Sequence, residues 1–162
     1  MNLNHFDAAG QAIMVDVSAK PPTRRTAIAE ARVRMQEATL DLVRAGKAAK
    51  GDVLGVARLA GIAAAKKTSD LIPLAHPLSI HAVGVEFEFD EPNSAIIVRG
   101  EVTAVERTGV EMEAMVAVSV AALTIYDMCK GADRAITIGE ISLLFKEGGK
   151  SGVYRRQERR DD

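Results

Sequence analysis

The acid–base pair Asp127 and Lys130 stands at the end of the most apolar stretch of the chain. This stretch, residues 109–131, reads GVEMEAMVAVSVAALTIYDMCKG and predicts one long core helix. Residues three apart share a helix face, and Asp and Lys are rarely fully buried unless they are paired. Two interpretations fit: an ion pair favoured by the helix dipole, or an acid–base pair whose pKa values are shifted by burial.

Two glutamates, Glu111 and Glu113, open the same predicted helix. Acidic residues in a first turn commonly compensate the helix dipole, and that explanation needs no chemistry. The spacing adds a constraint, because Glu113 and Asp127 are fourteen residues apart, which is about 21 Å along a helix. If both serve one site, the ligand is long or a second subunit contributes. The spacing therefore favours an oligomer.

A histidine with little conformational freedom lies between Pro73 and Pro77 in the segment LAHPL, residues 74–78. Proline fixes its own φ and restricts the residue before it, so His76 is held in a narrow range of conformations. A core histidine and a lone metal ligand are the alternatives. A metal needs more ligands, and His81 has no acidic partner at a recognisable spacing. We predict that His76 binds substrate and that the protein holds no metal.

Several cations fall on predicted loops and helix ends. Lys50 precedes Gly51 near a helix N-terminus, where backbone N–H groups can hold an anion, although a plain loop lysine is the alternative. The segment GGKSG at residues 148–152 is not a Walker motif, because Leu144 replaces the first glycine and no helix follows. The other such cations are Arg24, Arg25, Lys66 and Lys67. Together these groups suit a polyanionic organic substrate, best a nucleotide or another phosphorylated compound.

The elements that must position these residues are predicted from periodicity. Residues 26–45 show an imperfect helical stripe ended by Gly46, and Asp52 is placed to cap a second helix over 53–67. Residues 83–89 and 96–104 alternate apolar and polar side chains, which predicts a hairpin.

The remaining segments complete the predicted order. Residues 12–17 suggest an edge strand, 18–25 a mobile loop, and 135–146 a last strand with a bulge at Gly139–Glu140. The order α-α-β-β-α-β predicts an α+β fold with antiparallel strands and helices on one face.

The bulk composition excludes several classes of protein. A chain of 162 residues suits one domain, residues 1–162, with an N-terminal arm and loop (1–25) and a charged tail (153–162). The net charge of −1 and 4% aromatic content argue against a nucleic-acid partner. One cysteine allows no internal disulfide and no cysteine-based zinc site. No uncharged apolar run reaches the length of about 20 residues needed for a membrane span, so we expect a soluble cytoplasmic protein.

Six motifs, in order along nearly the whole chain, resemble the MoaC family, the cyclic pyranopterin monophosphate synthases of molybdenum cofactor biosynthesis. They are MVDVS (14–18), KGDV (50–53), DLIPLAHPL (70–78), TGVEMEA (108–114), YDMCK (126–130) and GGKSG (148–152). Ala75 replaces a cysteine common in the family, so that thiol is not essential here.

The resemblance implies a ferredoxin-like fold and a homohexamer, a trimer of dimers with sites between subunits. It implies a lyase that converts 3′,8-cyclo-7,8-dihydroguanosine triphosphate, a phosphorylated purine-derived compound, to cyclic pyranopterin monophosphate and pyrophosphate. It implies acid–base roles for Asp127 and Lys130 and proton donation by Lys50. Positioned acids and bases suffice for this chemistry without a redox cofactor.

The resemblance also implies the binding residues. Substrate contacts fall to Leu74, Ala75, His76, Met112 and Glu113, and phosphate contacts to Arg25, Lys146 and Lys150. Two other interpretations remain: a non-catalytic oligomeric module that senses nucleotides, and, least favoured, a nucleic-acid binder using a basic patch.

Overall fold

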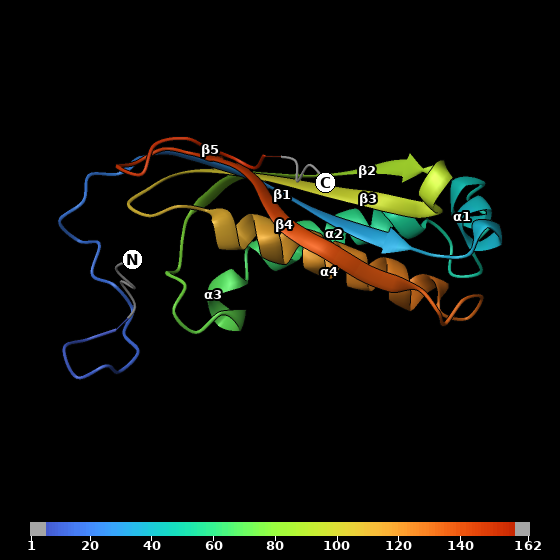
Figure 1. Ribbon diagram of the computed structural model, residues 1–162, viewed down its shortest axis with the longest axis horizontal. Coiled ribbons are helices and arrows are strands. Elements are labelled where there is room, and N and C mark those ends of the chain that lie inside the picture. Colours follow the sequence, from blue (N-terminus) through green and yellow to red (C-terminus); the bar gives the residue numbers. More distant parts are fainter. Residues whose placement is uncertain (1–5, 158–162) are drawn as a thin grey trace.

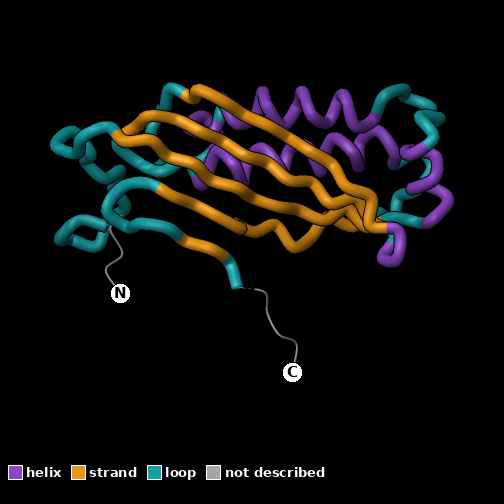
Figure 2. Tube along the Cα trace, turned by 90° about the horizontal axis from the view of Figure 1, so that it is seen from above, coloured by secondary structure: helices purple, strands orange, loops and turns teal. Residues whose placement is uncertain are grey.

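A single antiparallel sheet with the strand order β2-β3-β1-β4-β5 forms one layer of the molecule, and helices cover one of its faces (Figures 1 and 2). The computed structural model describes residues 6–157. The strands are β1 Thr23–Arg34, β2 Ile80–Asp90, β3 Ala95–Glu106, β4 Thr137–Glu147 and β5 Tyr154–Arg155. The helices are α1 Glu37–Arg44, α2 Val53–Ala65, α3 Thr68–Leu71 and α4 Glu111–Cys129, with a 3₁₀ turn η1 at Glu91–Asn93.

The predicted α+β class is confirmed, and the connectivity is that of a ferredoxin-like fold. Helices α1 and α2 connect β1 to β2, β3 follows in a hairpin, and α4 connects β3 to β4. β1 pairs with β3 on one side and with β4 on the other, both antiparallel. This is the split β-α-β arrangement, in which each crossover helix packs against the same sheet face.

The helix predicted over residues 26–45 is wrong in its first half. Residues 23–34 form β1, the central strand, and only Glu37–Arg44 is helical before the predicted stop at Gly46. Alternate side chains along β1, Ala27, Ala29, Ala31 and Val33, are fully buried beneath the helices. Alanine and arginine favour helices in isolation, but pairing on both edges outweighs that preference. The strand also begins at Thr23, so Thr23–Arg25 do not belong to the loop predicted over 18–25.

The elements predicted from alternation and capping are confirmed. β2 and β3 form the predicted hairpin, and Asp52 caps α2 by accepting a hydrogen bond from the Gly55 amide at 2.9 Å. β4 carries a register shift against β1, and Glu140 there adopts a φ of 53°, so the predicted bulge is present. The edge strand predicted over 12–17 is wrong, because Ala12 forms only an isolated bridge with Phe6. Part of the predicted tail, residues 158–162, lies outside the described residues.

Helices α2 and α4 pack closely because small residues line their contact. Gly61 faces the Ala117 carbonyl, and a methyl group at Gly61 would stand only 2.9 Å from that oxygen. α4 is long and apolar enough to cross a membrane. However, 56% of its most apolar 18-residue stretch is buried within the fold, as in the core helix of a soluble protein. The sheet and α2 therefore account for its apolar character.

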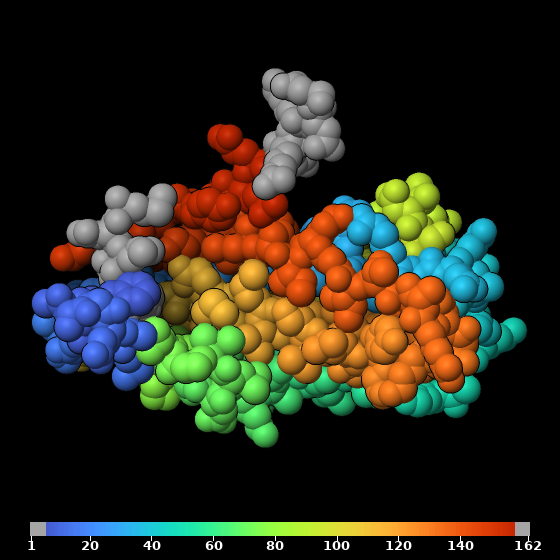
Figure 3. Space-filling view, turned by 60° about the horizontal axis from the view of Figure 1, so that its bottom comes forward, coloured from blue at the N-terminus to red at the C-terminus, as the bar shows by residue number. Residues whose placement is uncertain are grey.

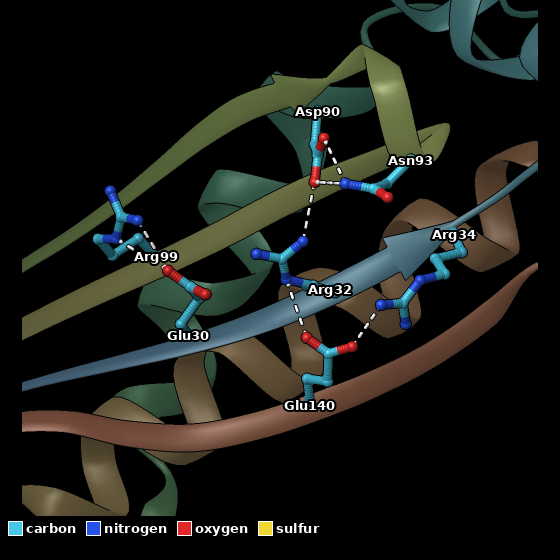
Figure 4. Close-up of polar contacts among 7 residues, drawn as sticks. All are labelled: Glu30, Arg32, Arg34, Asp90, Asn93, Arg99 and Glu140. Atoms are coloured by element: carbon cyan, nitrogen blue, oxygen red, sulfur yellow. Dashed lines mark hydrogen bonds and ion pairs between the residues drawn. The ribbon is translucent and has the colours of Figure 1, made fainter. Parts of the chain in front are cut away.

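The sheet face away from the helices carries a set of ion pairs (Figure 4). Arg32 on β1 bridges Asp90 at 2.8 Å and Glu140 at 2.9 Å. Arg34 also pairs with Glu140, and Arg99 pairs with Glu30 at 2.7 Å. Because Glu30, Arg32 and Arg34 alternate with the buried alanines of β1, the strand is apolar on one face and charged on the other.

Candidate functional site

The carboxylate of Asp127 lies between two lysines at the C-terminal end of α4. Its Oδ1 is 2.7 Å from Lys130 Nζ, and its Oδ2 is 3.1 Å from Lys50 Nζ. Lys50 Nζ also donates to the Asp127 carbonyl at 2.9 Å, so it satisfies an otherwise free carbonyl of the last turn. The structure thus brings together the three residues predicted as catalytic.

The loop between α1 and α2 delivers Lys50 to this cluster. The loop turns at Gly46 and Gly51, whose φ values of 65° and 91° favour glycine. A mostly apolar cavity of about 310 Å³, lined by Leu42, Ala48, Met128 and other residues, adjoins Lys50. The loop and the end of α4 lie beside α1, at the end of the molecule opposite the N-terminal arm (Figure 1).

The charges of the cluster stabilise one another. The hydrogen bond from Lys130, with a smaller one from Lys50, lowers the pKa of Asp127 below its usual range. The same contact raises the pKa of Lys130. All three side chains are half exposed, so a ligand has access to them. An ionised carboxylate with two ammonium groups can donate protons from either lysine and hold the resulting charge.

A second group of predicted residues surrounds a cavity of about 330 Å³ at the other end of α4. Leu74, Ala75 and His76 come from the segment after α3, whereas Met112 and Glu113 come from the first turn of α4. In the space-filling view the N-terminal arm, in blue, lies next to the segment after α3, in green (Figure 3). His76 Nε2 lies 2.6 Å from the Val15 carbonyl of that arm.

Glu113 is a buried carboxyl group, 3% exposed, in the lining of this cavity. Burial, with a smaller effect of the neighbouring Glu111, raises the pKa of Glu113 to about 7. A carboxyl group with this pKa exchanges its proton near neutral pH, so it can serve as a hydrogen-bond donor or acceptor towards a ligand.

A third and larger cavity, about 620 Å³, adjoins the second and is rich in cations. The predicted phosphate-binding residues Arg25, Lys146 and Lys150 all line it. Lys146 Nζ is 2.8 Å from Glu111 Oε1 and 3.2 Å from Ser151 Oγ. Four lining residues, Lys20, Thr108, Gly109 and Glu111, are common to this cavity and the previous one. The two spaces are therefore adjacent parts of one elongated site.

Two glycines make room for Arg25 in the larger cavity. Arg25 lies on the helix-facing side of β1 and donates from Nε and Nη2 to the carbonyls of Glu106 and Arg107, each at 3.3 Å. Gly148 and Gly149 have φ values of 104° and 71°, and a methyl group on Gly149 would overlap the Arg25 guanidinium. The segment GGKSG is thus a close-fitting cover for an arginine rather than a Walker loop.

The predicted site residues therefore form two separate groups on the chain, which we call half-sites. The Lys50–Asp127–Lys130 cluster lies at the C-terminal end of α4, and the predicted substrate-binding and phosphate-binding residues lie around its N-terminal end. Lys66 and Lys67 line neither half-site. Among residues 6–157, no three His, Cys, Asp or Glu side chains are grouped so that they could hold a metal ion.

Three residues near the half-sites were not predicted as site residues from the sequence. Lys20 and Arg107 line the cationic cavity. Asp133, only 2% exposed, accepts hydrogen bonds from the amides of Gln36 at 2.8 Å and Ala135 at 2.9 Å. Their contacts are made with segments distant in sequence or with backbone groups. No local pattern of side chains reveals such contacts.

The fold and the half-sites define a ferredoxin-like protein with an Asp–Lys cluster at one end of α4 and a cation-lined cavity at the other. Residues 14–149 match the model of the MoaC family, and the chain belongs to this family. The cyclic pyranopterin monophosphate synthase of Pelobacter propionicus is 68% identical over 158 residues, 98% of this chain and 99% of that protein. The synthase of Geotalea uraniireducens is 66% identical over 99% of this chain and 100% of its own length. The synthase of Geobacter sulfurreducens is 65% identical over 98% of this chain and 99% of its own length.

Proposed function

We propose that the chain is a cytoplasmic cyclic pyranopterin monophosphate synthase of molybdenum cofactor biosynthesis. It converts cyclised dihydroguanosine triphosphate to cyclic pyranopterin monophosphate and releases pyrophosphate. Membership of the MoaC family and the names of relatives more than 60% identical support this activity. The observation that carries the mechanism is the Asp127 carboxylate held between Lys50 and Lys130.

The reaction is a sequence of proton transfers followed by one phosphoryl transfer. Opening and re-closure of the purine ring system into a pterin moves protons among nitrogen, oxygen and water. A substrate hydroxyl oxygen then bonds to the α-phosphorus, and the bond from that phosphorus to the bridging oxygen breaks. The electron pair leaves with pyrophosphate, and the hydroxyl proton passes to a base.

The Lys50–Asp127–Lys130 cluster supplies the acids and bases. Lys50 and Lys130 donate protons to ring or leaving atoms, and Asp127 accepts a proton or keeps Lys130 charged. The lysines point to one carboxylate from two sides, so both can reach a ligand bound over Asp127. General acid–base catalysis of this kind contributes about 10²–10⁴ in rate.

The substrate lies along the elongated site at the other end of α4. The purine-derived part fits the smaller cavity, where Leu74, Ala75 and Met112 give apolar contacts and His76 and Glu113 give polar ones. The triphosphate fits the larger cavity, where Arg25, Lys146 and Lys150 offset its charge. No redox cofactor enters these steps.

The two half-sites come together between subunits. Glu113 and Asp127 are fourteen positions apart on α4. This spacing is about 21 Å along the helix, which is too far for one chain to present both residues to one reacting centre. A two-fold dimer places the C-terminal end of one α4 against the N-terminal end of its partner. Three such dimers form the homohexamer.

Incubation of the protein with cyclised dihydroguanosine triphosphate tests the proposal. Pyrophosphate release and the appearance of a pterin chromophore are expected, and neither should occur with Lys130→Ala. Binding without consumption of this compound would instead favour a module that senses nucleotides. Turnover that survives in Lys130→Ala would contradict the catalytic assignment.

A further inference from the structure

The tip of the N-terminal arm forms a compact turn at one end of the molecule (Figure 1). We call residues 6–14 the arm tip. The Asp7 amide donates to the Gln11 carbonyl at 2.9 Å, and Phe6 and Ala12 form an isolated bridge. Among residues 6–157, no hydrogen bond connects the arm tip to the rest of the chain. The arm tip is therefore held together by its own hydrogen bonds and is attached through the residues that follow it.

Large apolar side chains of the arm tip are exposed. Phe6 is 50% exposed, Ile13 41% and Met14 50%. Ile13 and Met14 line neither substrate cavity of their own chain. Val15, the next residue, lines the smaller cavity, and its carbonyl lies 2.6 Å from His76 Nε2. Two apolar side chains thus face solvent directly beside the substrate cavity.

The apolar cavity at the other end of α4 is large enough to take such side chains. Its volume is about 310 Å³, which is that of about ten water molecules. Leu42, Ala48, Met128 and Cys129 are among its lining residues, and Leu42 is 38% exposed, so the cavity opens to the surface. Lys50 also belongs to the lining. Whatever fills this cavity therefore contacts the loop that carries Lys50.

The two-fold dimer proposed above brings the arm tip and this cavity together. It places the N-terminal end of one α4 against the C-terminal end of its partner, so each smaller substrate cavity meets the partner subunit's Lys50. Val15 lines that substrate cavity, and the apolar cavity adjoins Lys50. Ile13 and Met14 directly precede Val15, so they lie beside the apolar cavity of the partner subunit.

The charges of the two surfaces are complementary. The only charged side chains from residue 6 to residue 16 are those of Asp7 and Asp16. Lys47 and Lys50 line the apolar cavity. An acidic segment with an apolar centre thus faces an apolar cavity with basic residues in its wall, which is the pattern of a protein–protein interface.

We propose that Ile13 and Met14 of each subunit insert into the apolar cavity of the partner, and that they are positioning residues for the partner subunit's Lys50. The inference rests on the dimer of the function proposed above. Apolar side chains packed against Ala48 and Ala49 restrict the loop that carries the lysine. Because a two-fold contact is isologous, each subunit both inserts an arm and receives one.

Disulfide trapping tests the position of the arm. Cys129 is the single cysteine of the chain and lines the cavity. Oxidation of Met14→Cys with copper phenanthroline should give a covalent dimer whose peptide map joins positions 14 and 129. One chain holds these positions at opposite ends of α4, whereas a disulfide needs Cα atoms within about 7 Å. The control Leu59→Cys, at a position on α2 that is 69% exposed, should form no link to Cys129.

A second cysteine pair makes the test independent of the buried thiol. Burial raises the pKa of Cys129, which slows its oxidation. The triple variant Met14→Cys/Leu42→Cys/Cys129→Ser uses two exposed positions instead. It should give a dimer joined between positions 14 and 42.

Labelling of the native Cys129 with a thiol reagent tests whether the arm fills the cavity. Met14→Asp should speed the labelling by about tenfold or more, because a carboxylate is not stable in an apolar cavity. Met14→Leu keeps the apolar volume and should retain the slow labelling of the wild type. Amide hydrogen exchange of residues 47–51 should increase in Met14→Asp and not in Met14→Leu.

The outcomes separate this inference from the proposed function. Absence of both the 14–129 and the 14–42 links would overturn the inference, whether or not the cyclised substrate is consumed. Unchanged labelling and exchange in Met14→Asp would overturn the positioning role. If the links form but the cyclised substrate is not consumed, the inference stands and the proposed function fails.

Discussion

Glu113 and Asp127 mark opposite ends of the same helix and belong to different half-sites. If one active site combines the two ends from two subunits, two different inactive variants restore each other when mixed. Asp127→Asn disables one half-site and Lys146→Met the other. After dissociation and reassociation at equal amounts, hybrid dimers should carry one intact site each, giving about a quarter of wild-type activity.

The matched control for this complementation uses two variants of the same half-site. Lys50 and Lys130 both contact the Asp127 carboxylate, so a mixture of Lys50→Ala and Lys130→Ala should recover no activity. Native mass spectrometry would verify that hybrids have formed in both mixtures. Verified hybrids of Asp127→Asn with Lys146→Met that stay inactive would show that each chain has a complete site.

Replacement of either lysine around Asp127 should slow the chemical step and leave the fold intact. Lys50→Met and Lys130→Met are expected to lower kcat by about 10²–10⁴, the contribution of a positioned acid or base. Because these side chains are half exposed, their ion pairs add little to stability and the melting temperature should hardly change. The double variant should be about as slow as the single ones, since the residues act as a unit. A kcat near that of wild type in either variant would contradict the assignment.

Local sequence patterns predicted those features that depend on neighbouring residues. The alternation of β2 and β3, the Asp52 cap and the spacing of Asp127 and Lys130 each have a local cause. β1 was misassigned because its buried apolar positions are mostly alanine, which favours a helix until two neighbouring strands pair with it. Spacing alone did not place Lys50 beside Asp127, because that contact joins residues seventy-seven apart.

The raised pKa of Glu113 makes the stability of the protein depend on pH. The folded state raises this pKa from 4.5 to about 7, so ionisation is less favourable in the folded than in the unfolded chain. The folded state then binds more protons between these values, and stability falls as pH rises from about 4.5 to 7. Below pH 4.5 the titration of Glu113 does not lower the stability. Above pH 7 it lowers the free energy of unfolding by at most about 3 kcal/mol.

Glu113→Gln removes this titration while keeping the shape of the side chain. Relative to wild type, the variant should gain unfolding free energy progressively between pH 5 and 8 in denaturant titrations at one protein concentration, by up to about 3 kcal/mol. Glu101→Gln, on the exposed face of β3, is the control and should show no comparable gain. Parallel pH profiles for wild type and Glu113→Gln would mean that Glu113 ionises normally in the folded protein.

The buried carboxylate of Asp133 should be essential to stability rather than to chemistry. It accepts hydrogen bonds from the amides of Gln36 and Ala135, and its Oδ2 is 3.5 Å from Thr39 Oγ1, so it joins the start of α1 to the segment that follows α4. Asp133→Ala leaves two backbone donors unpaired in a buried place, which should cost about 2–4 kcal/mol of unfolding free energy. Asp133→Asn retains one acceptor oxygen and should cost less. The exposed Asp41→Ala is the control, expected to change stability by less than about 0.5 kcal/mol. Equal stability of Asp133→Ala and Asp41→Ala would show that the start of α1 does not depend on this side chain.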